Sequence, residues 1–345
     1  MHSLLSELVT RLTAGEAVAT ATIVYQNGSA PRGAGSKLLA DANGLLRGTT
    51  GGGLAEARAI EACARSLRDG RAAELNVFMD GELAANADMI CGGQVRLLIE
   101  PFLPGKAPLA LLRQTAQDAN KGGCVALRPF PPDGNDQWSL LTADGRLLGA
   151  PLDLTGEERA ALREKTDAGV ISAGGKSLFA EPCCPARRLI IAGGGHVSRP
   201  TVTVGALAGF EAHVLDDRSE YARPERFPEA ASVRVVPDFL HCFDELAPGP
   251  RDYIVIVTRG HRHDGTVLEQ ALRTEAAYIG MIGSHRKKEQ VFQRMREEGF
   301  RQAELDRVFS PIGLAIGAET PEEIAVSIIA QCIAHRRDAS CGRWP

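Results

Sequence analysis

Three glycines at 193–195 lie where an apolar run, residues 189–192, gives way to a helix-compatible segment. A second apolar run, residues 212–215, follows and ends at Asp216. A strand, a glycine turn, a helix and a second strand with an acid at its tip form a nucleotide-binding pattern. Gly193 and Gly195 carry no Cβ, so the backbone can approach a pyrophosphate there, and the following helix offers N–H groups to the anion.

Asp216 gives this pattern a preference among nucleotides. A carboxylate at this position accepts hydrogen bonds from ribose hydroxyls and repels a 2′-phosphate, which favours NAD-like over NADP-like ligands. Ser198 replaces the usual third glycine and is still small enough for close packing of helix on strand. The alternative is a glycine-rich turn with no ligand. The flanking strands and the acid together favour nucleotide-type binding.

Two further strands are expected over residues 253–257 and 277–282, and both end in polar residues. Because ligands of doubly wound sheets bind beyond the carboxyl ends of the strands, these residues and the glycine turn should share one crevice. The candidates are His196, Arg259, His261, Gly283, Ser284 and Arg286. A solvated first helical turn explains the basic residues at 286–288 equally well, and His263 is better explained as a structural histidine.

The first half of the chain has its own candidates. Gly51, Gly52 and Gly53 open an expected helix with Glu56 in its first turn, and such a turn is suited to holding an anion. Cys91 is flanked by glycines, so a bulky ligand could reach its sulfur. Taken alone, tight turns and a small buried residue explain both features better.

The order of expected elements predicts an α/β protein with two domains. Residues 1–184 should form an N-terminal α/β domain whose motifs lie within 1–102, and residues 185–345 a Rossmann-like, doubly wound parallel sheet. The boundary is placed at residues 182–185, where two prolines flank adjacent cysteines. Residues 103–180 carry no usable motif.

Composition narrows the class of protein. The chain has 345 residues and a net charge of −4, which gives no electrostatic case for nucleic acid or an acidic membrane surface. It has no apolar run of membrane-spanning length and no signal-peptide pattern at the N-terminus, so we expect a cytoplasmic protein. The eight cysteines include no CxxC pair, and reduced thiols are expected.

These motifs, in this order, resemble the XdhC/CoxI family of xanthine dehydrogenase accessory factors. The resemblance spans nearly the whole chain apart from the middle. The residues that carry it are Gly28–Arg32, Gly51–Glu56, Cys91–Gly93, Gly193–Val197, Asp216–Arg218, Thr258–His261 with Asp264, Tyr278–Ser284, Ser310–Leu314 and Glu319–Ala325. The Thr258–His261 segment departs from the Thr-His of many members and looks like the branch associated with selenium-dependent molybdenum hydroxylases.

The resemblance implies a chaperone for molybdenum cofactor rather than a conventional enzyme. Such a protein binds molybdopterin or its dinucleotide form during sulfuration by a cysteine desulfurase, then delivers it to a xanthine dehydrogenase-type hydroxylase. Under this hypothesis the 193–195 turn holds phosphate, Asp216 a ribose and Cys91 the molybdenum. We also expect a homodimer. The alternative is an NAD-dependent oxidoreductase with His196 or His261 as acid–base. A nucleotide sensor without chemistry is a third hypothesis.

Overall fold

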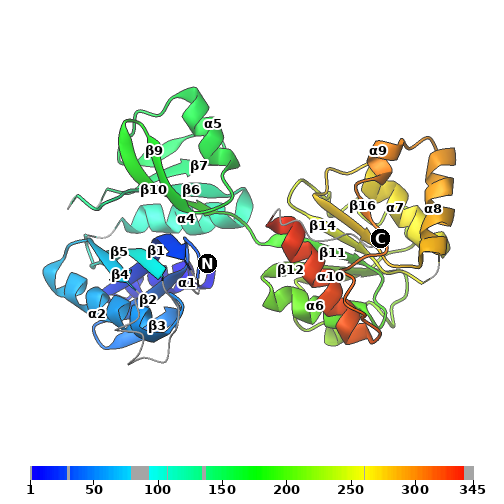
Figure 1. Ribbon diagram of the computed structural model, residues 1–345, viewed down its shortest axis with the longest axis horizontal. Coiled ribbons are helices and arrows are strands. Elements are labelled where there is room, and N and C mark those ends of the chain that lie inside the picture. The colour runs from blue at the N-terminus through cyan, green and yellow to red at the C-terminus, as the bar shows by residue number, and fades with distance from the viewer. Residues whose placement is uncertain are drawn as a thin grey trace. The chain divides into compact units, whose positions relative to one another are not determined.

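The computed structural model describes residues 2–28, 32–78, 93–106, 108–133, 137–259 and 261–337. The chain divides into two compact units, Met1–Pro185 and Ala186–Pro345, and each is described by itself (Figure 1). The described part contains no helix long and apolar enough to cross a membrane.

The first unit contains two antiparallel sheets. Sheet A has the order β3-β2-β1-β5-β4 and sheet B the order β8-β7-β6-β10-β9. The strands are β1 (Val18–Gly28), β2 (Lys37–Asp41), β3 (Gly44–Gly48), β4 (Ala73–Phe78), β5 (Gly93–Phe102), β6 (Cys124–Pro129), β7 (Ser139–Thr142), β8 (Leu147–Gly149), β9 (Gly169–Ala173) and β10 (Lys176–Cys183). The helices are α1 (His2–Thr13), α2 (Gly53–Asp69), α4 (Leu109–Lys121) and α5 (Gly156–Glu164).

Side chains along β1 alternate between the two faces of sheet A, and both faces are buried there. Ala19, Ala21 and Ile23 pack under α2 in one apolar cluster. Thr20 and Thr22 point to the opposite face and are also buried. The second face of sheet A is therefore covered as well, and polar side chains lie in that covered region.

The second unit is a parallel sheet, here called sheet C, with the order β13-β12-β11-β14-β15-β16. Its strands are β11 (Arg187–Ala192), β12 (Phe210–Asp216), β13 (Ser232–Val235), β14 (Tyr253–Ile256), β15 (Tyr278–Met281) and β16 (Val308–Phe309). Its helices are α6 (Ser198–Leu207), the short η1 (Pro224–Arg226), α7 (His261–Leu272), α8 (His285–Glu297), α9 (Gln302–Leu305) and α10 (Pro321–Arg336).

Counted along the unit, this strand order is 3-2-1-4-5-6, the Rossmann order, so the predicted fold class is confirmed. Helices α6 and α10 pack on one face of the sheet, and α7 and α8 on the other (Figure 1). In β14 every residue is buried, as expected for a central parallel strand covered on both faces. Chain order reverses between β11 and β14, and this switch point is where ligands of such sheets bind.

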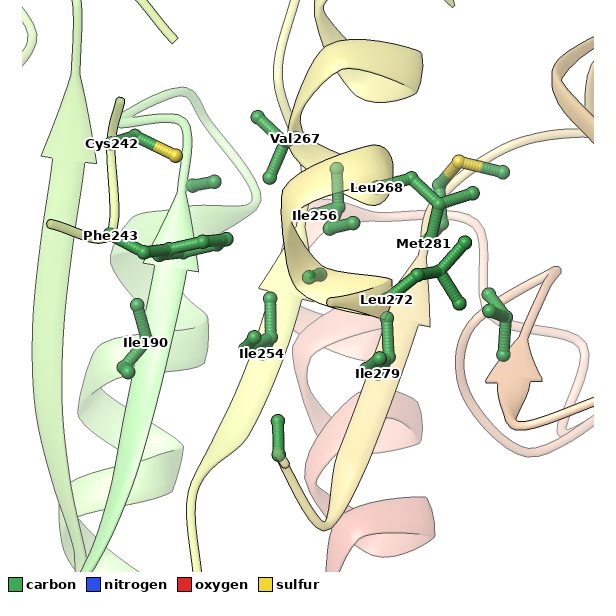
Figure 2. Close-up of a cluster of buried hydrophobic side chains, with 14 of the residues drawn as sticks. Ile190, Cys242, Phe243, Ile254, Ile256, Val267, Leu268, Leu272, Ile279 and Met281 are labelled. Atoms are coloured by element: carbon green, nitrogen blue, oxygen red, sulfur yellow. The ribbon is translucent and has the colours of Figure 1, made fainter. Parts of the chain in front are cut away.

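The core on the α7 side is a single apolar cluster. Ile190, Ile254 and Ile279 project from neighbouring strands toward α7, where Leu268 is fully buried (Figure 2). This packing holds α7 against the sheet.

Truncating that core should destabilise the second unit. We expect Leu268→Ala to lower the free energy of unfolding by about 2–5 kcal/mol, because it leaves a cavity among packed side chains. Leu207→Ala is the control, since Leu207 is 85% exposed and should change stability by less than about 0.5 kcal/mol. Urea unfolding followed by circular dichroism measures both, and equal effects would contradict this account of the core.

Candidate functional site at the carboxyl edge of sheet C

The glycine turn after β11 is built so that only glycine fits its first position. Gly193 has a φ of 112°, and a Cβ placed there would lie 2.4 Å from the carbonyl oxygen of Val257. Its N–H donates to the carbonyl of Leu215 at 2.7 Å. The turn is therefore pinned between β12 and the end of β14, at the switch point of the sheet.

The carboxylate of Asp216 holds this turn in place through hydrogen bonds. Its side chain is 1% exposed, and Oδ2 accepts a hydrogen bond from the Gly194 N–H at 2.7 Å. Oδ1 accepts from both the backbone N–H and Nε of Arg218. Burial raises the pKa of Asp216, but the hydrogen bonds from Arg218 and Gly194 outweigh it and leave the pKa below its ordinary value. The carboxylate thus has donors within the protein, and its contact with a ribose stays a prediction.

The outer side of the turn is open. A Cβ at Gly195 would meet nothing within 4 Å, and His196 is exposed. Ser198 is buried at the start of α6, and its hydroxyl donates to the Gly193 carbonyl at 2.5 Å. Since the first N–H groups of a helix have no partner within the helix, the Gly195 side of the turn offers backbone donors to an anion.

A second group, after β14, was not predicted as a unit from the sequence. Asp264 is fully buried in the first turn of α7, and its Oδ1 accepts from Thr258 N at 3.2 Å and Thr258 Oγ1 at 2.5 Å. The ammonium of Lys287, in α8, forms an ion pair with Oδ2. Burial raises the pKa of Asp264, and the opposing effects of Lys287 and Thr258 only partly offset it.

A local signal for this group exists in the sequence. Thr258 follows an expected strand, and Asp264 lies six residues later, in the first turn of an expected helix. This spacing alone could have predicted that the Asp264 carboxylate accepts a hydrogen bond from Thr258. The contribution of Lys287 depends on the adjacency of β14 and β15, which no local pattern specifies.

The end of β15 supplies the remaining predicted residues. Gly283 has a φ of 154°, which residues other than glycine rarely adopt. The Ser284 hydroxyl caps α8 by accepting a hydrogen bond from the Lys287 N–H at 3.3 Å. Arg286 is exposed in the first turn of α8. The amino end of α8 therefore lies at the same edge of the sheet as that of α6.

Arg259 connects two strand ends. Its Nη2 donates to Asp217 Oδ2 at 2.8 Å, which joins the end of β12 to the residues after β14. His261 begins α7, but its side chain lies outside the described residues, as does Gly260.

The remaining predicted residues belong to the first unit. Gly51, Gly52 and Gly53 all have positive φ values, and the N–H groups of Thr50 and Gly52 donate to Glu56 Oε2 at 3.0 and 3.3 Å. Burial raises the pKa of Glu56, but these bonds and one from the Thr49 hydroxyl outweigh it and lower the pKa overall. This turn therefore holds the protein's own carboxylate, and the binding of a cofactor anion by Gly51, Gly52, Gly53 and Glu56 stays a prediction.

Cys91 lies outside the described residues. No disulfide joins the cysteines in the described ranges, and the described part of the chain contains no cluster of histidine, cysteine or acidic residues suited to a metal ion. The predicted molybdenum ligand therefore stays a prediction.

Fold and site define a two-unit α/β protein with a Rossmann-type unit whose polar strand ends gather at the switch point. Residues 189–332 match the model of the XdhC Rossmann domain, and residues 11–78 match the model of the XdhC and CoxI family. The chain belongs to the XdhC and CoxI family.

Two relatives show how far the similarity extends. YqeB of Escherichia coli is 32% identical over 155 residues, which are 45% of this chain and 28% of that protein. A protein of Bacillus subtilis described as a probable xanthine dehydrogenase subunit is 31% identical over 162 residues, 47% of this chain and 46% of the relative. In both cases the match spans less than half of the relative's length.

The molybdenum cofactor insertion chaperone PaoD of Escherichia coli matches this chain along almost its whole length. The two are 21% identical over 343 residues, which are 99% of this chain and 91% of PaoD. A crystal structure described as a xanthine dehydrogenase from Bacillus halodurans superposes with a TM-score of 0.77 at 24% identity, covering 97% of this chain and 96% of that one. This structural likeness establishes the shared fold.

The role of Asp216 in the turn predicts a pH-dependent stability. Because the folded state lowers its pKa, Asp216 stabilises the fold above its ordinary pKa of about 3.9, and this contribution is lost as pH falls through the folded-state value. We expect Asp216→Asn to cost about 1.5–3 kcal/mol at neutral pH, and the difference from wild type to narrow below about pH 4.

Asp217→Asn is the matched control, because its partner Arg259 is 51% exposed and such pairs contribute less than about 1 kcal/mol. Urea unfolding at several pH values measures both variants. A cost for Asp216→Asn that does not change with pH would contradict the assigned role.

Proposed function

We propose that this protein binds molybdenum cofactor and inserts it into a xanthine dehydrogenase-type molybdenum hydroxylase. Membership of the XdhC and CoxI family supports this role, and so does the similarity to the insertion chaperone PaoD along almost the whole chain. The cofactor is cargo in this proposal, since it is bound, held and passed on.

The observation that carries the proposal is the open backbone at Gly195 beside the start of α6. The cargo carries a terminal phosphate, or an internal pyrophosphate in its dinucleotide form. A phosphate fits a position where a Cβ would meet nothing within 4 Å and where helical N–H groups have no partner within the helix. Ser284 and Arg286 at the start of α8 offer a second position for anionic oxygens, since both side chains are exposed there.

NAD is the alternative ligand, because sheet C has the strand order of dinucleotide-binding domains. Its usual ribose acceptor here would be Asp216, whose oxygens accept bonds from Gly194 and Arg218. Because these oxygens already have donors within the protein, the turn is better suited to binding a phosphate than a ribose. Sulfuration of the bound cargo by a cysteine desulfurase, a homodimeric state and a cytoplasmic location complete the proposal.

A methyl group at Gly195 tests the phosphate position. Gly195→Ala should fold normally, because the site has room for a Cβ, yet the methyl group would lie in the path of the phosphate. We expect cofactor retention to fall at least about tenfold, equivalent to about 1.4 kcal/mol. The measurement is molybdenum and oxidised-pterin content after anaerobic purification from a molybdenum-replete host.

The control is Gly249→Ala, whose Cβ would approach only Asp252 Oδ2 at 3.9 Å. Wild-type protein with neither molybdenum nor pterin but with tight NAD binding would favour the oxidoreductase alternative. If wild type and Gly195→Ala retain equal amounts of cofactor, the turn at Gly195 does not bind its phosphate.

Cys91→Ser tests the proposed molybdenum ligand. A thiolate is a soft ligand suited to transient binding of such a metal, and a hydroxyl is a poor substitute. We expect molybdenum content to fall while the unfolding midpoint is unchanged. Cys184→Ser is the control, since Cys184 is a partly exposed thiol far from Cys91 in the sequence. If both variants keep wild-type molybdenum content, Cys91 is not a ligand.

A further inference from the structure

Two cysteines of sheet B lie opposite each other on neighbouring antiparallel strands. Cys124 begins β6 and Cys183 ends β10, and the two residues are direct partners in the ladder. Directly opposite residues of antiparallel strands share one face of the sheet, and their Cα atoms lie about 4.5 or 5.5 Å apart. Because a disulfide needs a Cα separation of about 4.4–6.8 Å, the backbone already lies within the range of a cross-link.

The side chains of these two cysteines are also in contact. Both are 4% exposed and pack in the same apolar cluster, and Cys124 Sγ lies 3.8 Å from the carbonyl oxygen of Cys183. A hydrogen bond between the two thiols raises the pKa of Cys124, and burial adds to this effect. Since this bond keeps the proton on Cys124, Cys183 is the sulfur that reacts first with an oxidant.

Cys184 is next in the chain but has a different neighbour. Its Sγ lies 3.2 Å from the position that a Cβ on Gly123 would occupy, so a glycine lies across from it. Among the described residues, the paired strands place no other two cysteines opposite each other. Cys124 and Cys183 are therefore the pair suited to a bond, and Cys184 is a matched control.

A small oxidant has a route to this pair. The pair closes the ladder between β6 and β10, and the ends of a ladder open at a lower free energy than its centre. Cys183 borders a cavity of about 320 Å³ and Cys124 borders another of about 340 Å³. Both cavities are much larger than a peroxide molecule.

We propose that Cys124 and Cys183 form a reversible disulfide when the protein meets a peroxide. The Cys183 sulfur attacks one peroxide oxygen, the O–O bond breaks, and a water leaves while Cys183 becomes a sulfenic acid. The Cys124 sulfur then displaces the hydroxyl group, which takes the Cys124 proton and leaves as a second water. Two thiols are oxidised and one hydrogen peroxide is reduced, and a dithiol reverses the reaction by exchange.

The bond would fasten the last strand of the first unit. Cys183 lies two residues before Pro185, where that unit ends, and 59 residues after Cys124. A disulfide that closes a loop of this length stabilises the folded state by restricting the unfolded chain. Peroxide should therefore make the first unit harder to unfold.

Peptide mapping of the full chain tests the bond directly. Trypsin releases Cys124 in the peptide of residues 122–128, and Cys183 together with Cys184 in that of residues 177–187. After hydrogen peroxide and blocking of free thiols with iodoacetamide, we expect mass spectrometry to find the two peptides linked, and dithiothreitol to separate them. Cys183→Ala should lose the linked peptide, whereas Cys184→Ala should keep it.

Thermal unfolding followed by circular dichroism provides a second readout. We expect peroxide to raise the unfolding midpoint of wild type by at least about 4 °C and to leave that of Cys183→Ala unchanged. Absence of the linked peptide from oxidised wild type, or its persistence in Cys183→Ala, would overturn the proposal. So would an oxidised wild type that unfolds at or below the midpoint of the reduced protein. Neither readout involves the cofactor, so the outcome is independent of the proposed function.

Discussion

The bond between the Gly194 N–H and the buried carboxylate of Asp216 is the constraint on which the candidate site depends. It fixes the turn after β11 at a point where a Cβ on Gly193 would meet the Val257 carbonyl. With its inner side fixed, the turn presents its outer side, at Gly195, to solvent at the switch point of sheet C. A mobile turn would lose conformational entropy on binding an anion, whereas this one is already ordered.

The same device recurs in the chain. Glu56 accepts from the glycine turn that opens α2, and Asp264 accepts from Thr258 at the end of β14. Each carboxylate satisfies backbone N–H groups that an external anion could otherwise bind. A glycine turn in the sequence therefore indicates a ligand site only where donors stay open, as on the Gly195 side of the first turn. At Gly51–Gly53 the internal carboxylate leaves less room for that role.

The sequence predicted the Rossmann unit well because its signals are local. The apolar strands and the glycine turn each lie within a few residues, as does the capping box from Thr320 to Glu323 that opens α10 in the structure. Short or weakly apolar elements were missed, among them β9, β13 and β16. The middle of the chain gave no motif, yet it forms most of sheet B. Arg128 pairs with Glu100 and Glu181, 28 and 53 residues away, and such contacts leave no periodic trace in a sequence.

That buried cluster needs a reason beyond stability. Desolvating Arg128 and two carboxylates is costly, and replacing a buried ion pair by well-packed apolar residues is often neutral or stabilising. The guanidinium also lies over the rings of Trp138 and Phe179, at 4.7 and 5.0 Å from their centroids, which offsets part of the cost. Burial alone would favour full pairing, yet Glu181 Oε1 has no hydrogen-bond partner among the described residues. The cluster joins Glu100 of sheet A to Arg128 and Glu181 of sheet B, so it is better explained as fixing how the two sheets pair than as a source of stability.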